Sequence, residues 1–131
     1  MRDYAPALGA AGISYNAFRE LDYFCRQYPE KKRRAAALIR LCAARLDHQP
    51  RAREPGDPTF RSVAAREALE KDIALIEDTA RAVCPQCPGQ LVRHVTEKLP
   101  ISALNPACGR RAFCQARSAF YVQLYHRRWA G

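Results

Sequence analysis

The sequence predicts an all-α protein in which long, kinked N-terminal helices precede a C-terminal helical bundle. Three observations lead to this fold class. Apolar residues recur at spacings of three and four along several segments, as they do on the buried face of a helix. No segment alternates apolar and polar residues over the length of a strand, and prolines and glycines separate the helical segments.

The N-terminal part is predicted to contain a flexible tail over residues 1–13 and two helices within residues 14–47. Ser14 is suited to cap the first helix. Pro29 predicts a kink or break just before it, because proline lacks an amide hydrogen and disfavours helix in the preceding residue. The side chains of Glu20, Asp22 and Glu30 are expected to be solvated. The apolar face of the first helix is formed by Ala17, Phe18, Leu21, Phe24, Cys25 and Tyr28.

The segment HQPRAREPGD, residues 48–57, is rich in proline and glycine and is predicted to be a linker. Residues 58–131 form the second predicted region. Asp57 followed by Pro58 is a strong helix start, because the carboxylate can cap the helix and proline fits its first position. Helices are expected over residues 58–83, 88–99 and 110–129, with the irregular piece ISALNP between the last two.

The charge of the chain narrows the class of partner. Its 131 residues include 22 Lys and Arg against 13 Asp and Glu, a net charge of +9 that suits nucleic acid, an acidic protein or an anionic surface. No apolar run is long enough to span a bilayer and no secretion signal is recognisable, so we expect a cytoplasmic protein with reduced cysteines and no membrane partner. No catalytic constellation or phosphate-binding glycine loop stands out, which predicts no enzyme activity and no cofactor.

The last predicted helix separates into two faces at 100° per residue. One stripe is apolar and is predicted to be buried. Arg111, Gln115 and Ser118 fall on the opposite side, which is predicted to face solvent. The residues of the buried stripe are Phe113, Ala116, Phe120 and Leu124.

The solvent face of this helix has the chemistry of a DNA-reading surface. Arg111 and Gln115 lie one turn apart and can bind guanine and adenine edges in a major groove, while small Ser118 permits close approach. No acidic residue follows Glu97, a charge distribution that suits a polyanion. The alternative interpretation is an ordinary basic surface helix. The side chains expected to contact phosphates are Lys98, Arg110, Arg117 and Arg128.

The segment PACGRRAFCQARSAFYVQL resembles the end of a family of short phage and prophage proteins from Firmicutes. YNAFRELDYFCRQYPEKKRR resembles their N-terminal helix and DPTFRSVAAREALEKDIALIEDTAR their central one, so the resemblance covers most of residues 15–126. The C-terminal half of that family looks like the DNA-binding region four of sigma factors, a helix-turn-helix. The resemblance implies a helix-turn-helix bundle over residues 58–131 and a phage-type transcription regulator, with double-stranded DNA and RNA polymerase as partners.

The resemblance also assigns positions. The turn and helix entry match Cys108, Gly109 and Arg110, the buried aromatics match Phe113 and Phe120, and a basic position of the recognition helix matches Arg117. Cys114 and Ala112 stand where the family usually has tyrosine and threonine. The stretch ISALNPAC is shorter than its counterpart, which normally holds the first helix of the helix-turn-helix. That helix is then either a single turn within this stretch or the helix over residues 88–99.

Four cysteines have spacings that raise the question of zinc. Cys84 and Cys87 have zinc-knuckle spacing, and Cys108 with Cys114 would complete four ligands, with His94 and His126 as substitutes for the last one. The sequence favours the other interpretation, in which these cysteines are small residues at a helix junction and buried thiols. A redox-active disulfide between the first two cysteines would need a βαβ context that the chain lacks.

A protein-interaction module is the alternative to DNA binding. Residues 15–47 would then form a homodimer or bind another protein, and the last helix would be only structural. Such a module could also contain a structural zinc ion.

Overall fold

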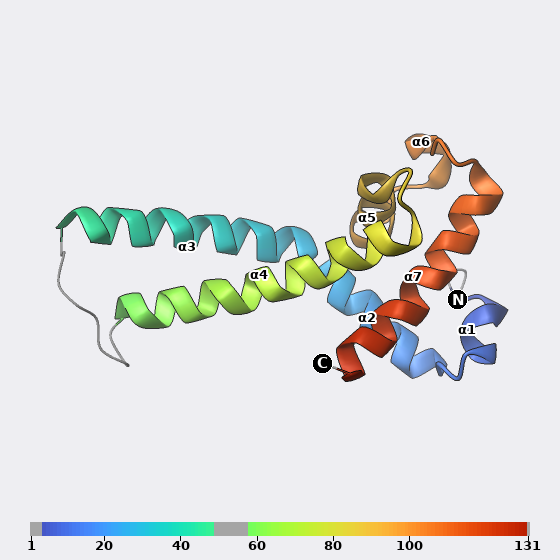
Figure 1. Cartoon of the computed structure of the whole chain (residues 1–131), viewed down its shortest axis with the longest axis horizontal. Coiled ribbons are helices and arrows are strands. Elements are labelled where there is room, and N and C mark those ends of the chain that lie inside the picture. Colours follow the sequence, from blue (N-terminus) through green and yellow to red (C-terminus); the bar gives the residue numbers. More distant parts are fainter. Residues whose placement is uncertain (1–3, 49–57, 131) are drawn as a thin grey trace. The chain divides into compact units, whose positions relative to one another are not determined.

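The computed structural model describes residues 4–48 and 58–130 (Figure 1). Within these ranges every regular element is a helix and no strand occurs, which confirms the all-α prediction. The predicted linker lies outside the described residues, except for His48 at the end of a helix. The helices are α1 (Pro6–Ala10), α2 (Tyr15–Arg26), α3 (Tyr28–His48), α4 (Pro58–Val83), α5 (Pro88–Glu97), α6 (Ile101–Leu104) and α7 (Arg110–Ala130).

The described residues form two compact units whose boundaries differ from the predicted regions. The first unit contains residues 4–27 and 75–130, and the second contains residues 28–48 and 58–74. Helix α4 therefore contributes to both units. The prediction grouped α2 with α3, whereas α2 packs against α5 and α7.

Part of the segment that the sequence predicted to be a flexible tail, residues 1–13, is helical. Residues Pro6–Ala10 form α1, which contacts α7. Leu8 and Ile13 are buried, and the Tyr4 hydroxyl donates a hydrogen bond to the Ile13 carbonyl at 2.7 Å. The prediction was wrong because it weighed the alanines and glycines of this segment and overlooked the burial of its few large apolar side chains.

Both predicted features of α2 are present at its ends. Ser14 caps the helix, since its Oγ accepts a hydrogen bond from the Ala17 amide at 3.1 Å. The helix ends at Arg26, Gln27 separates it from α3, and Pro29 occupies the second position of α3. A proline there loses no helical hydrogen bond, because the first amides of a helix have no partner within it. The break predicted before Pro29 is thus confirmed.

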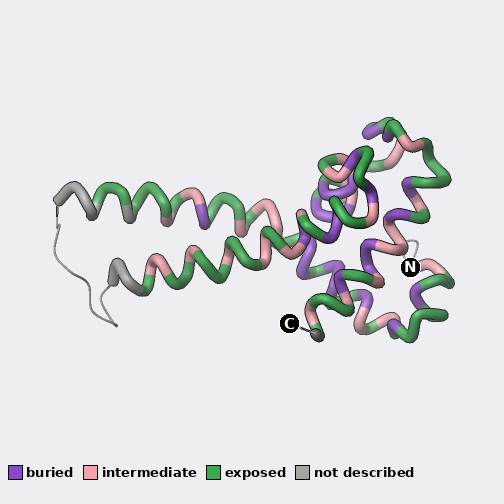
Figure 2. The backbone as a smooth tube through the Cα atoms, viewed as in Figure 1, coloured by how far each residue is buried: buried purple, intermediate pink, exposed green. Residues whose placement is uncertain are grey.

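The second unit consists of α3 and the N-terminal part of α4, which lie side by side (Figure 1). Lys31 donates a hydrogen bond to Asp72 at 2.9 Å and so connects the two helices. Few of its described side chains are buried, as Figure 2 shows, and Ala35 is one of them. Ile39 and Leu41 on α3 are 47% and 42% exposed.

The core of the first unit is built around α7. Its stripe of Phe113, Ala116, Phe120 and Leu124 is buried, as the helical periodicity predicted. Tyr121 is also buried, and its ring packs edge-on against Phe18 of α2 with centroids 5.0 Å apart. Ile76 near the end of α4 and Leu91 of α5 are also buried in this core.

The segment between α5 and α7 contains a one-turn helix, α6, and three residues with a left-handed backbone, the first of which is Lys98 with φ +60°. Asn105 ends α6 with φ +47°, and Gly109 precedes α7 with φ +86°. Helix α5 contacts both α6 and α7. The ISALNPAC stretch thus contains a single helical turn, and α5, the other candidate for the first helix of a helix-turn-helix, is also present. Among the described helices, none combines the length and apolar character that crossing a membrane requires.

Candidate nucleic-acid interface

Helix α7 begins with two arginines whose positive charges no acidic residue in the first turn balances. The Phe113 amide donates to the Gly109 carbonyl at 3.0 Å, so the helix is entered directly after the glycine. Arg110 and Arg111 lie in the first turn, which has no acidic residue. Cations are disfavoured at this end of a helix because the backbone amides there carry a partial positive charge. This end of α7 is accordingly suited to an anion.

The predicted base-contacting residues lie on one open surface. Arg110, Arg111, Cys114, Gln115 and Ser118 line a shallow recess on the N-terminal half of α7. Arg111 and Gln115 are exposed, and Ser118 is half-buried. Within the described residues, neither Arg110 nor Arg111 has a hydrogen bond or ion pair. We call these five residues the α7 basic face.

Lys98, predicted to contact phosphate, is instead bound within the first unit. Its ammonium donates to the carboxylate of Asp22 on α2 and lies 3.4 Å from the Tyr121 hydroxyl. Asp22 is buried and also accepts a hydrogen bond from Arg26 Nε at 3.0 Å. A buried carboxylate is stable only when paired with cations, so Lys98 is engaged by Asp22 and does not reach toward a phosphate. The expectation that Asp22 is solvated was also wrong.

Arg117 is held against α5. Its guanidinium donates a hydrogen bond to His94 Nε2 at 3.1 Å, and His94 Nδ1 lies 2.6 Å from the Leu99 carbonyl. This pattern fits a neutral imidazole that carries its proton on Nδ1, because Nε2 must accept and the carbonyl must receive. The His94 ring also packs edge-on against Phe113. Arg117 therefore connects α7 to α5, and its availability to phosphate is reduced.

Arg128 is held at the other end of α7. Its guanidinium donates to Glu20 of α2 and lies 4.2 Å from the centre of the Phe24 ring. Such a cation over an aromatic face is stabilising. Of the four predicted phosphate contacts, only Arg110 lies on the α7 basic face and has no partner among the described residues.

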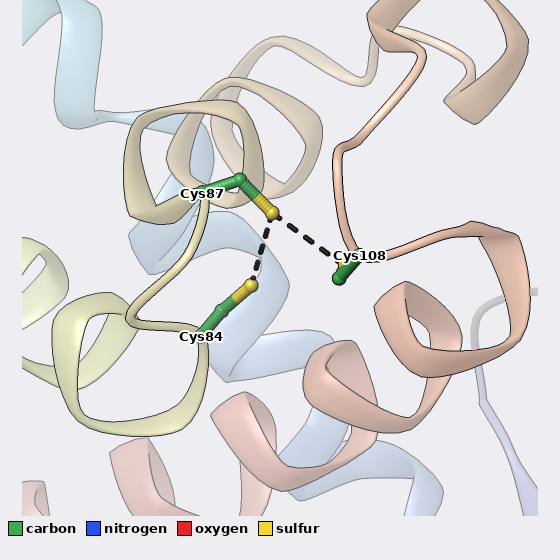
Figure 3. Close-up of side chains that lie close together, drawn as sticks. All are labelled: Cys84, Cys87 and Cys108. Atoms are coloured by element: carbon green, nitrogen blue, oxygen red, sulfur yellow. Dashed lines mark hydrogen bonds between the residues drawn. The ribbon is translucent and has the colours of Figure 1, made fainter.

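Of the four cysteines considered as zinc ligands, three lie close together and the fourth lies elsewhere. Cys84, Cys87 and Cys108 place their sulfurs within 4.8 Å of one another (Figure 3). Cys84 follows α4, Cys87 precedes α5 and Cys108 lies just before α7. Cys114 lies on the α7 basic face. We call the first three the cysteine cluster.

The sequence contains a signal for the role of Asp22, and the prediction of solvated acidic side chains overlooked it. Asp22 follows Phe18 by four residues and precedes Cys25 by three, so it lies on the apolar face of α2. An acidic residue within an apolar stripe indicates a buried partner rather than a solvated charge.

No protein family, curated protein or solved structure matches the chain.

Proposed function

We propose that the protein binds double-stranded DNA through the α7 basic face. Arg111 and Gln115 contact base edges, Ser118 permits close approach to the groove, and Arg110 contacts a phosphate. The observation that carries the proposal is the pair of exposed arginines in the first turn of α7, without partners among the described residues. A DNA phosphate would relieve the repulsion between these cations and the helix dipole.

The arrangement of α5, α6 and α7 supports the same proposal. A short helix, a turn and a longer helix with polar groups on its exposed N-terminal half is the order found in helix-turn-helix proteins. The internal contacts of Arg117 and Arg128 hold α7 against α5 and α2, which would keep the reading side chains in a fixed orientation. The resemblance to phage proteins extends the proposal to a transcription regulator that acts beside RNA polymerase.

The proposal is tested by fluorescence anisotropy with duplexes recovered from a random pool at moderate salt. We expect affinity to fall steeply with salt, since each phosphate neutralised releases condensed counterions. Arg111→Ala should weaken binding to the selected duplex about tenfold and relax its sequence preference. Arg110→Ala should weaken binding to all duplexes alike.

A matched control comes from the same helix. Arg127 is exposed near the C-terminal end of α7, where its guanidinium lies 3.4 Å from Gln123 Oε1. Arg127→Ala removes the same charge away from the α7 basic face and should change affinity much less than Arg110→Ala or Arg111→Ala. An equal loss of DNA affinity in all three variants would mean that only the net charge of the protein matters. If the unaltered protein does not bind DNA at low salt, the proposal is wrong.

Self-association is the second candidate function, and the structure restricts where it would occur. The apolar face of α2 is buried within the chain and is not available to a second copy. Ile39 and Leu41 of α3 remain exposed and keep this candidate open. Light scattering after size exclusion distinguishes the two candidates, since a stable dimer that ignores DNA would favour self-association.

A further inference from the structure

The cysteine cluster brings together thiols from two turns that are distant in the sequence. Cys84 and Cys87 lie at the turn between α4 and α5, and Cys108 lies at the entry to α7. The Cys84 and Cys87 sulfurs are 3.2 Å apart, and those of Cys87 and Cys108 are 3.6 Å apart. Cys84 and Cys87 are buried and Cys108 is half-buried, so the cluster is accessible from the side of Cys108.

We propose that the cysteine cluster binds one zinc ion through the sulfurs of Cys84, Cys87 and Cys108, with a water or small exogenous ligand in the fourth position. The metal then fastens the turn between α4 and α5 to the entry of α7. This inference stands independently of DNA binding, because it concerns the fixing of the helices and not what α7 contacts.

The spacing of the sulfurs fits a single tetrahedral ion. Zinc–sulfur bonds of about 2.3 Å in a tetrahedron place the sulfurs about 3.8 Å apart. The observed separations of 3.2 and 3.6 Å are close to this value. In a four-iron cluster each thiolate binds a different iron atom and the thiolates lie farther apart, whereas these three sulfurs all lie within 4.8 Å of one another.

The local backbone also fits a metal-binding turn. The Cys87 amide donates to the Cys84 carbonyl at 3.3 Å, which closes a tight turn between the two ligands. Pro88 then starts α5 directly after the second ligand. Gly109 follows Cys108 with φ +86°, a backbone conformation that glycine adopts without strain. All three ligands are therefore held at the ends of helices rather than within them.

The other side chains considered as a fourth ligand have different positions. His94 has Nε2 occupied by Arg117 and Nδ1 by the Leu99 carbonyl. Cys114 lies on the α7 basic face. Within the described residues, no fourth histidine, cysteine or carboxylate joins the group. Three protein ligands and one open position are the arrangement of zinc sites that keep an exchangeable ligand.

Metal binding must displace the thiol protons. Burial raises the pKa of the Cys87 thiol, and its hydrogen bond with Cys84 raises it further. Burial likewise raises the pKa of Cys108, with an added contribution from its hydrogen bond with Cys87. Without metal the thiols of Cys87 and Cys108 are therefore neutral at pH 7. As zinc–sulfur bonds form, the S–H bonds break, and the protons pass to solvent.

The test uses the full chain, purified without a histidine tag and without added metal. Mass spectrometry of the metal content should find about one zinc per chain, and a mercurial that binds the thiolates should displace it. After chelation, titration with Co²⁺ should produce thiolate-to-cobalt charge-transfer absorption. Cys108→Ser should weaken Co²⁺ binding about tenfold or more. Cys114→Ser, which removes a half-buried thiol outside the cluster, should leave it unchanged.

A measurement on the unaltered chain covers the case in which a variant fails to fold. Zinc should protect Cys84, Cys87 and Cys108 from alkylation, as read by peptide mass spectrometry, while Cys114 is modified at the same rate with and without metal. Equal binding by the Cys108→Ser and Cys114→Ser variants would overturn the proposal. So would the absence of Co²⁺ binding by folded, reduced chain, or alkylation of all four cysteines at rates that zinc does not alter.

Discussion

At the scale of single residues, Asp22 is a buried charged group that connects two helices of the first unit. Its carboxylate is buried on the apolar face of α2 and bonds to Lys98, which follows α5, and to Arg26. Lys98 ends α5 with φ +60°, a left-handed conformation that is uncommon for a lysine. One carboxylate thus holds the end of α5 against α2.

Removal of the Asp22 charge should therefore destabilise the protein. Asp22→Asn leaves the Lys98 ammonium without its counter-ion, and we expect the free energy of unfolding to fall by about 1–3 kcal/mol. The measurement is urea denaturation followed by circular dichroism. Glu20→Gln is the control, because Glu20 is 57% exposed and its ion pair with Arg128 is largely solvated. A similar loss in both variants would show that the buried position of Asp22 adds nothing.

At the scale of elements, the entry to α7 is set by the backbone of Gly109. Its φ of +86° lies in the region where a Cβ is unfavourable, although an added Cβ would meet nothing within 4 Å. Gly89 in α5 likewise has open space around an added Cβ, and no positive φ. The two glycines therefore differ in backbone conformation and not in packing.

Alanine substitutions at these two glycines should have opposite effects on stability. Gly109→Ala should lower the free energy of unfolding by about 1–2 kcal/mol, the cost of a left-handed conformation for an L-residue. Gly89→Ala should raise it by about 0.5 kcal/mol, because alanine loses less conformational freedom in a helix. Thermal unfolding of both variants checks this. Equal stability of the two would contradict the role assigned to the Gly109 backbone.

The sequence predicted the elements of the fold better than their partners. Helix α4 occupies the predicted residues, and α7 differs from its predicted range by one residue, because Pro58 and Gly109 are strong local signals. Leu8 of α1 could not be assigned to the core, since its burial depends on α7, which lies far along the chain. Arg111 and Gln115 are exposed, as the periodicity of α7 predicted. The partner of Lys98, Asp22, is 76 residues away in the sequence, and the periodicity of a single helix cannot reveal such a contact.

At the scale of the whole molecule, burial is unevenly divided between the two units. The first unit contains nearly all of the described buried apolar side chains, and α3 contributes Ala35 to them (Figure 2). Regions with few buried apolar contacts open at a lower free energy than a packed core. Local stability should therefore differ between helices of similar length.

Native-state hydrogen exchange should show this difference directly. We expect the amides of α3 to exchange by local opening, much faster than those of α7 between Phe113 and Leu124. Mass spectrometry of peptides from the two helices provides the measurement, and α7 serves as the internal control because it has the same 21-residue length. Equal protection would mean that the two units unfold together.

The first unit is assembled from both sides of the second one in the sequence. Residues 28–74 separate α2 from the end of α4 and from α5 and α7, and α2 packs against α5 and α7. During synthesis, Phe18 and Leu21 therefore leave the ribosome well before the helices that will cover them. A nascent chain halted before α7 would expose these apolar side chains to chaperones. The first unit would fold fully only after its last helix has been synthesised.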